Sequence, residues 1–475
     1  MTKFVKKRYD VLMIICCAAF VIPLVFTGPA ISLHAVKNDI GGDRFSLEWI
    51  INSYVIAFGG FVMAAGVAGD YIGRRLCFIT GLVLFSLSSI CIAVSHDLLI
   101  IITMRMLEGI GGALVSTSAT SLLAQDFYGK NKTIAFSLLG TSFGAGLAFG
   151  PIIAGFMIDF LGWRSLYWGI SIFSILIVAL GQWKIKESKN DNAERLDWIG
   201  LIIFTLALIL FTYALILGGK IGFSDIRIYV IIFFVALFIM AFYLIEKNTD
   251  NPLVDISLFK IPLFFGVQLL PLLMAFSYIS LFVYLPMWLM TGGNFSASQT
   301  GIIILPLTLP MLVIPLLSGC LAKNYPINNI SGIGFFIASI GVCMLINSTY
   351  EKIWLISFAM ALIGIGNALP WGLMDALSVS VVPQEKAGLA SGLFNTMRVA
   401  GEAIAITLVG SLINILTSIY INSSSISDST QIVSYSYRVT FQILFIIIFI
   451  LTLLAGLFCL FFLKERDITN KLTNK

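Results

Sequence analysis

Long apolar stretches recur from one end of this chain to the other, and they limit the fold more than any other feature. A helix of about 20 apolar residues is long enough to cross the hydrocarbon core of a bilayer. Fourteen stretches of this kind occur, and the polar stretches between them are too short for a soluble domain. Only 11% of the residues are charged, against about 25% in soluble proteins. The sequence therefore predicts an all-α membrane protein.

The positions of Lys and Arg predict how the spans are oriented. The predicted spans are residues 11–34, 47–69, 76–95, 98–124, 133–159, 163–183, 197–218, 227–245, 261–290, 299–321, 330–347, 353–381, 388–420 and 438–463. If both termini are cytoplasmic, 20 of the 29 Lys and Arg residues lie in cytoplasmic segments and 7 lie outside. This bias matches the positive-inside rule. We expect a multi-pass protein of the bacterial cell (inner) membrane with both termini in the cytoplasm.

Several other classes of protein are disfavoured by composition. The net charge of +5 comes with no basic domain that would bind nucleic acid. The seven cysteines lie in or beside apolar segments without the spacing of metal ligands. The first apolar stretch is longer than a signal-peptide core and is interpreted as a retained span. We expect no metal and no cofactor; the bilayer is the surrounding solvent.

The loop at 66–75 reads GVAGDYIGRR and carries the most specific pattern in the chain. Arginines that anchor a helix end beside a solvated Asp are the simpler interpretation. The spacing instead resembles the signature loop of the major facilitator superfamily, and the matching residues are Gly66, Asp70, Gly73, Arg74 and Arg75. The resemblance implies a cytoplasmic gate in which this loop contacts the start of the span at 388–420. In such a contact the negative charge of Asp70 would be stabilised by the partial positive charge at the N-terminus of that helix.

The fourth span contains RMLEGIGGA, in which Arg105 and Glu108 are three residues apart and share one helix face. One interpretation is a structural ion pair. The other is functional, because ionisable groups inside a membrane usually mark a transport pathway. The pattern resembles the second motif of the superfamily, whose Arg is assigned to proton handling; Glu108 stands where Gln is usual.

Small residues line one side of the fifth span, in GTSFGAGLAFGPIIAGF. Such a groove lets another helix approach closely, and a packing role alone would explain it. The stretch also resembles the antiporter motif of the superfamily through Gly146, Gly150, Pro151 and Gly155. That motif is commonest in exporters of drugs and metabolites.

Further similarities extend the resemblance to the fourteen-span drug:proton antiporter branch, notably in residues 251–260, 305–310 and 388–403. The resemblance implies two six-helix bundles and two extra transmembrane helices. We assign the N-terminal bundle to 1–183, the linker with the two additional spans to 184–260, and the C-terminal bundle to 261–475. Two such halves around a central cavity permit alternating access. A functional monomer is expected.

The chain also departs from that branch. Val25 stands where the first span usually carries an Asp that serves cation recognition or proton coupling. Acids elsewhere are candidates to replace it: Asp375 in the twelfth span, and Glu402, one turn after Arg398, in the thirteenth. The simpler interpretations are an Asp near a helix end that reaches water, and an internal Arg–Glu pair four residues apart that stabilises packing. Burial and a neighbouring Arg act on a carboxyl's proton affinity in opposite senses.

These features predict a proton-coupled secondary exporter of amphipathic drugs or toxic compounds. We assign proton coupling or substrate binding to Arg105, Glu108, Asp375, Arg398 and Glu402, and consider Tyr284 and Trp371 as cavity aromatics. The partners are protons and a small-molecule substrate. The alternative is a dedicated exporter of an endogenous metabolite, such as a siderophore or another organic anion, which the missing Asp and the intramembrane arginines favour.

Three other classes fit less well. A membrane-embedded enzyme would need a catalytic constellation, but the two histidines, His34 and His96, lie near outer span ends without ligand spacing. An ATP-driven pump would need a phosphate-binding Gly-x-x-x-x-Gly-Lys-Ser/Thr loop, which is missing. A sensor that keeps the fold but transports nothing would show no flux. We expect no enzymatic activity.

Overall fold

A computed structural model describes residues 2–127, 129–188, 197–249, 262–322, 324–381, 387–423 and 429–463. Among these residues every regular element is a helix and none is a strand. The chain divides into two compact units. The first unit comprises Met1–Phe211, Ile231–Leu253 and Ser296–Gly301, and the second comprises Thr212–Val230, Val254–Phe295 and Ile302–Lys475.

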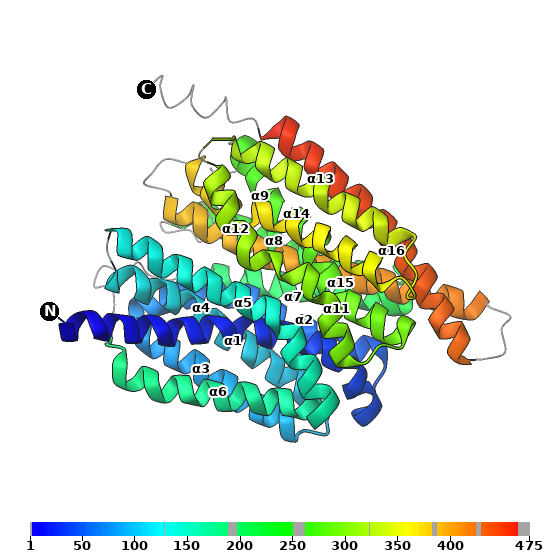
Figure 1. Cartoon of the computed structure of the whole chain (residues 1–475), viewed down its shortest axis with the longest axis horizontal. Helices are drawn as coiled ribbons and strands as arrows, with labels where there is room; N and C mark the ends of the chain where they lie inside the picture. Colours follow the sequence, from blue (N-terminus) through cyan, green and yellow to red (C-terminus); the bar gives the residue numbers. More distant parts are fainter. Residues whose placement is uncertain are drawn as a thin grey trace. The chain divides into compact units, whose positions relative to one another are not determined.

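Six long helices make up most of the first unit (Figure 1). They are α1 Thr2–Ile40, α2 Arg44–Ile72, α3 Arg74–Val94, α4 Leu98–Asp126, α5 Gly129–Leu161 and α6 Trp163–Lys184. Side-chain caps begin two of them, because the Asp43 carboxylate accepts from Ser46 N at 3.1 Å and the Asp97 carboxylate accepts from Leu99 N at 2.8 Å. Such caps satisfy amides that a helix start leaves unbonded. Each predicted span from the first to the sixth thus corresponds to one helix.

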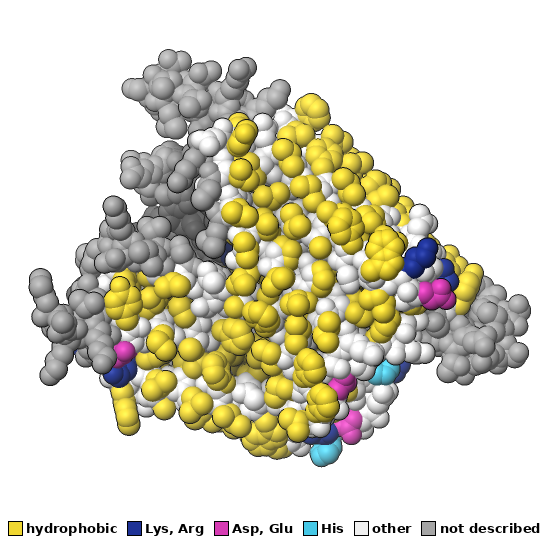
Figure 2. All heavy atoms as spheres, viewed as in Figure 1, with side chains coloured by type: hydrophobic (Ala, Val, Ile, Leu, Met, Phe, Trp, Pro, Cys, Tyr) yellow, Lys and Arg dark blue, Asp and Glu magenta, His cyan; other side chains and the backbone are white. Residues whose placement is uncertain are grey.

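The predicted linker spans are also helical. They are α7 Trp198–Ile221 and α8 Ile226–Asn248. Large apolar side chains of α8 point outward, including Tyr229, Phe233 and Met240, which are 58%, 65% and 58% exposed. Exposed apolar surface on this scale is stable in lipid and unfavourable in water. Figure 2 shows hydrophobic side chains over most of the face in view, with only small groups of charged ones.

The second unit contains broken as well as continuous helices. Its elements are α9 Pro262–Met274, η2 Ala275–Ile279, α10 Ser280–Met287, η3 Trp288–Gly292, α11 Ala297–Thr308, α12 Pro310–Leu321, α13 Ile327–Ile346, α14 Ile353–Ser380, α15 Ala387–Ser423 and α16 Ser429–Phe462. The elements η2 and η3 are π-helical turns that lie beside Pro271 and Pro286. Proline lacks an amide hydrogen, so it disturbs the regular ladder locally.

Thirteen stretches of the described residues are long and apolar enough to cross a membrane. The prediction was fourteen. The remaining predicted span, 47–69, falls in α2, whose described apolar stretch Ser46–Val62 is shorter than the others. The structure therefore supports an all-α protein with many spans, and the count of fourteen remains a prediction. The division into 1–183, 184–260 and 261–475 also remains a prediction.

Candidate transport site

The predicted loop at 66–75 is mostly helical, because α2 runs to Ile72 and α3 begins at Arg74, so that Gly73 alone separates them. A carboxylate that the sequence analysis missed holds the start of α3. Glu187, which follows α6, accepts hydrogen bonds from the backbone amides of Arg75 and Leu76, each at 3.0 Å. It therefore caps the start of α3. Arg75 also donates through Nη2 to the Gln182 carbonyl at 2.8 Å. The only signal in the sequence was a single Glu among the lysines of KIKESK.

Gly73 is required here for two separate reasons. Its φ of +140° is a backbone conformation that L side chains rarely adopt. A Cβ at this position would also lie 2.7 Å from the Glu187 carboxyl carbon. By contrast, nothing lies within 4 Å of a Cβ built at Gly66. The predicted contact of Asp70 falls outside the description, because neither the Asp70 side chain nor residues 382–386 are described.

Arg105 and Glu108 form a completely buried ion pair, with both side chains 0% exposed and Arg105 Nη1 2.5 Å from Glu108 Oε2. Ser89 of α3 donates to Glu108 Oε1 at 2.5 Å, and Arg105 Nε donates to the Ile50 carbonyl of α2 at 2.9 Å. The guanidinium carbon lies 4.5 Å from the centre of the Tyr54 ring. The pair thus joins α2, α3 and α4, and both Glu108 oxygens are bonded.

The predicted groove of α5 is occupied by α1. A Cβ at Gly146 would lie 2.3 Å from the Phe20 carbonyl oxygen, and one at Gly150 would lie 2.6 Å from Thr27 Oγ1. The other end of the motif packs against the start of α11, because a Cβ at Gly155 would lie 2.4 Å from the Ala297 carbonyl oxygen. Each of these glycines permits an approach that any side chain would block.

Asp159 of α5 also caps that helix start. Its Oδ1 accepts from Ala297 N at 3.2 Å and its Oδ2 from Ser298 N at 2.8 Å. A Cβ at Gly301, one turn further along α11, would lie 2.6 Å from the Pro151 carbonyl oxygen. The antiporter motif therefore contacts a different helix on each side.

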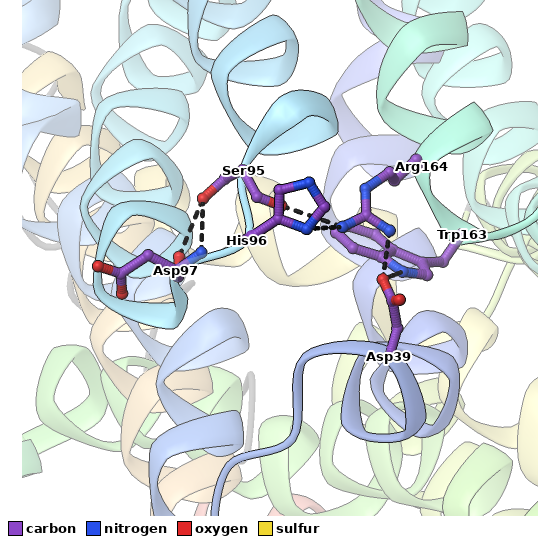
Figure 3. A network of polar contacts seen from close by, with 6 residues as sticks. All are labelled: Asp39, Ser95, His96, Asp97, Trp163 and Arg164. Atoms are coloured by element: carbon purple, nitrogen blue, oxygen red, sulfur yellow. Dashed lines mark hydrogen bonds and ion pairs between the residues drawn. The ribbon is translucent and has the colours of Figure 1, made fainter.

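A polar network ties together the end of α1, the turn between α3 and α4, and the start of α6 (Figure 3). Arg164 forms an ion pair with Asp39, which also accepts from Trp163 Nε1 at 3.0 Å. Arg164 Nη2 donates to the Ser95 carbonyl at 3.2 Å and lies 3.1 Å from His96 Nδ1. The side chains of Asp39 and Arg164 are 43% and 28% exposed, so this network lies at the end of the bundle, away from the buried pair.

A small cavity in the second unit brings together several predicted site residues. Arg398 and Glu402 of α15 both line it. The remaining wall is mostly aromatic and sulfur-containing, from Met274 of α9, Trp371 and Met374 of α14, and Phe394 of α15. The Arg398 guanidinium carbon lies 5.9 Å from the centre of the Trp371 ring. A concave site with few polar groups in an apolar wall is typical of binding pockets.

The structure does not bring every candidate to this cavity. Tyr284 is only 2% exposed, and its hydroxyl donates to the Ile406 carbonyl at 2.9 Å, so it braces α10 against α15 and does not line the cavity. Val25, which the sequence analysis places where an Asp was expected, is buried in α1. Asp375 lies in α14, and its side chain is outside the described part. No group of three or more metal-binding side chains occurs among the described residues.

Thirteen described stretches long and apolar enough to cross a membrane, together with charged side chains in a cavity of the second unit, are typical of membrane transport proteins. The sequence profile of the Major Facilitator Superfamily matches residues 13–406 and 273–475. The chain therefore belongs to that superfamily and is a multi-pass protein of the cell membrane.

Among curated proteins, the chain is 26% identical over 384 residues to the multidrug resistance protein Stp of Mycobacterium tuberculosis (strain CDC 1551 / Oshkosh), which covers 81% of this chain and 72% of Stp. It is 26% identical over 412 residues to the tetracenomycin C resistance and export protein of Streptomyces glaucescens. That match covers 86% of this chain and 76% of the relative.

Solved structures share the fold. A bacterial homologue of the human lysosomal transporter Spinster, in an inward-facing and occupied conformation, superposes with a TM-score of 0.70 at 13% identity and covers 95% of this chain and 96% of its own. A D-xylose–proton symporter gives a TM-score of 0.66 at 15% identity, and the match covers 97% of this chain and 99% of the symporter.

Proposed function

We propose that this chain is a proton-coupled exporter that moves amphipathic drugs or toxic compounds out of the cell by alternating access. The observation that carries the proposal is the cavity of the second unit, in which Glu402 and Arg398 lie within an aromatic and methionine-rich wall. Relatives named for multidrug resistance and for antibiotic export support the direction of transport. We also propose that both termini lie in the cytoplasm and that the monomer is the transporting unit.

Coupling requires a carboxylate that binds a proton on one side of the membrane and releases it on the other. Glu108 is poorly suited, because both of its oxygens are bonded and the pair is sealed from solvent. Glu402 lines a cavity and forms no hydrogen bond or ion pair with any described residue. Intramembrane acids with access to a cavity are the usual proton relays of transporters. We therefore assign coupling to Glu402 and a positioning role to Arg105 and Glu108.

The cytoplasmic gate belongs to the same proposal. Glu187 ties the start of α3, directly after Gly73, to the segment that follows α6. In this proposal the junction of α2 and α3, with Asp70, Arg74 and Arg75, contacts the start of α15 in one state of the transport cycle and separates from it in the other. The bonds of Glu187 lie within the first unit.

The test is substrate-driven proton flux in proteoliposomes that contain the full chain. Glu402→Gln is expected to abolish exchange, and Glu108→Gln to retain exchange per folded molecule while lowering the yield of folded protein. Glu351→Gln is the matched control, because Glu351 is an exposed residue in a turn. Wild-type exchange by Glu402→Gln removes the coupling assignment.

A second candidate is an exporter dedicated to one metabolite. Val25 in place of the usual acid favours it, because a pump for organic cations generally needs that carboxylate. One relative is named a tetracenomycin C resistance and export protein and another a probable actinorhodin transporter. A susceptibility panel of cationic dyes, compared with secreted metabolites of a deletion strain, separates the two candidates.

A further inference from the structure

The helix α7 is divided between the two compact units. Its residues up to Phe211 belong to the first unit and those from Thr212 onward to the second, although the helix runs without a break from Trp198 to Ile221. The helix α8 is divided in the same way, and its residues from Ile231 onward belong to the first unit. Each unit therefore holds one part of the two linker helices by contacts of its own.

The first unit holds α7 at a contact that we call the N-terminal attachment, formed by Thr205 of α7 and Gly60 of α2. The Thr205 hydroxyl donates to the Gly60 carbonyl at 3.2 Å, and a Cβ at Gly60 would lie 2.8 Å from Thr205 Cγ2. The neighbouring Phe204 ring lies 5.7 Å from the Phe242 ring of α8. This part of α7 is thus fastened both to α2 and to α8.

The second unit holds α7 at the C-terminal attachment, formed by Leu215 and Gly219 of α7 and Ser411 of α15. The Ser411 hydroxyl donates to the Leu215 carbonyl at 2.7 Å, and a Cβ at Gly219 would lie 2.9 Å from Ser411 Cβ. Leu215 and Gly219 are about one helical turn apart, so Ser411 contacts a single face of α7. Ser411 is buried, so water does not compete for this hydrogen bond.

The sequence of α7 provides no hinge between the two attachments. Residues 206–214 read LALILFTYA and contain neither proline nor glycine, the residues at which helices usually kink. The ten positions from Thr205 to Leu215 correspond to about 15 Å along the helix axis. Alternating access moves the two halves of a transporter relative to each other. A straight helix that is fastened to both halves must release one of them during that movement.

We propose, as an inference that rests on the proposed export function, that α7 is a strap with a permanent N-terminal attachment and a releasable C-terminal attachment on α15. The first unit holds the larger part of the two linker helices, residues 198–211 and 231–248, whereas the second unit holds 212–230. The smaller part is the one that detaches. Gly219 and Ser411 are positioning residues, because neither lines the cavity of the second unit.

The releasable attachment lies on the helix that carries the proposed coupling carboxylate. Ser411 follows Glu402 by nine residues on α15, which is about 13 Å along the helix axis. A movement of α15 during proton exchange therefore changes the distance between Ser411 and Leu215. The hydrogen bond of Ser411 stabilises the state in which α7 and α15 are attached, and its loss favours the detached state.

The test is pulsed electron paramagnetic resonance of the full chain in lipid nanodiscs, recorded at pH 5 and pH 8 with nitroxide labels on exposed residues. One labelled pair, Ser224→Cys with Ser418→Cys, reports on the C-terminal attachment. The other, Ile202→Cys with Ile72→Cys, reports on the N-terminal attachment. We expect two distances for the first pair, because α7 detaches from α15, and one distance for the second pair at both pH values.

The labels need a chain without other reactive thiols. Cys77 and Cys459 are buried and stay in place, and the other five native cysteines are replaced by alanine. The unfolding temperature of this background is first compared with that of the wild-type chain, so that every labelled variant starts from a folded protein.

Matched variants then test the two hydroxyl contacts. Ser411→Ala is expected to shift the ratio of the two distances toward the longer one by about two- to tenfold, as for the loss of one hydrogen bond. Thr205→Val removes the corresponding hydroxyl of the N-terminal attachment and should leave that ratio unchanged. Gly219→Ala provides a second route, because its methyl group crowds Ser411 and should shift the ratio in the same direction.

Three results would overturn the strap: a single distance for the first pair, two distances for the second pair, or equal effects of Ser411→Ala and Thr205→Val. Transport is scored separately, as proton-driven flux of the cationic dyes and of the secreted metabolites in proteoliposomes. Flux together with a single distance for the first pair keeps the exporter and overturns the strap. Two distances without flux of any of these compounds keep the releasable attachment and overturn the exporter.

Discussion

The Glu187 carboxylate lies directly against Gly73, so that a Cβ on residue 73 would come within 2.7 Å of its carboxyl carbon. This contact joins two residues that lie 114 positions apart in the chain. It explains why Gly73, between α2 and α3, has less room for a Cβ than Gly66 or Gly69 of α2. It also ties the junction of α2 and α3 to the segment that follows α6.

We expect Gly73→Ala to destabilise the protein by about 1–3 kcal/mol, because alanine is strained at a φ of +140° and its methyl group meets Glu187. The measurement is thermal unfolding in detergent. Gly66→Ala is the control, because nothing lies near its Cβ position. Equal stability of the two variants would contradict the assignment.

Removing the Glu187 carboxylate should destabilise the start of α3. Glu187→Ala is expected to cost about 0.5–2 kcal/mol, the usual range for a lost helix cap. Amides of α3 near Arg75 and Leu76 should then exchange faster with solvent. Hydrogen exchange of peptides from that segment is the measurement, and unchanged protection there would argue against the cap.

The buried pair of α4 should behave as a unit. Glu108→Ala leaves a buried guanidinium without its partner and is expected to cost about 3–5 kcal/mol. Replacing both members, Arg105→Met with Glu108→Leu, should cost less than the single change. Thermal unfolding of the single and double variants provides the measurement. A double variant that is less stable than Glu108→Ala would rule out this compensation.

Two glycines of α5 provide a matched comparison. Gly146→Ala places a methyl group 2.3 Å from the Phe20 carbonyl oxygen of α1 and is expected to cost about 1–3 kcal/mol through overpacking. Gly140→Ala meets nothing within 4 Å and should be neutral or slightly stabilising. Thermal unfolding and transport of both variants are compared. Similar unfolding temperatures for the two would show that α1 shifts to accommodate the methyl group without cost.

Tyr284→Phe should separate bracing from ligand binding. The variant loses the hydrogen bond to the Ile406 carbonyl and is expected to lose about 0.5–1.5 kcal/mol of stability. Because Tyr284 does not line the cavity, substrate-driven proton flux per folded molecule should be unchanged, whereas Trp371→Ala should lower that flux. A loss of flux in Tyr284→Phe at unchanged folding would show that the Tyr284 hydroxyl takes part in transport.

Much of the architecture could be predicted from the amino-acid sequence. In lipid the backbone has no water to bond, so long apolar stretches must become helices. Their lengths predict most of the helix positions, and the spacing of glycines beside Pro151 predicts a groove. The family could also be inferred, because motif residues such as Gly73 and Arg75 lie close together in the chain.

The tertiary structure decided which of the charged residues is exposed to a cavity. Arg105–Glu108 and Arg398–Glu402 are similar pairs in sequence, yet the first is closed by Ser89 and the second lines a cavity beside Trp371. Nor does helical periodicity reveal that Glu187 caps α3. Such relationships depend on residues brought together from distant parts of the chain, whereas sequence periodicity reports only on neighbours along one helix.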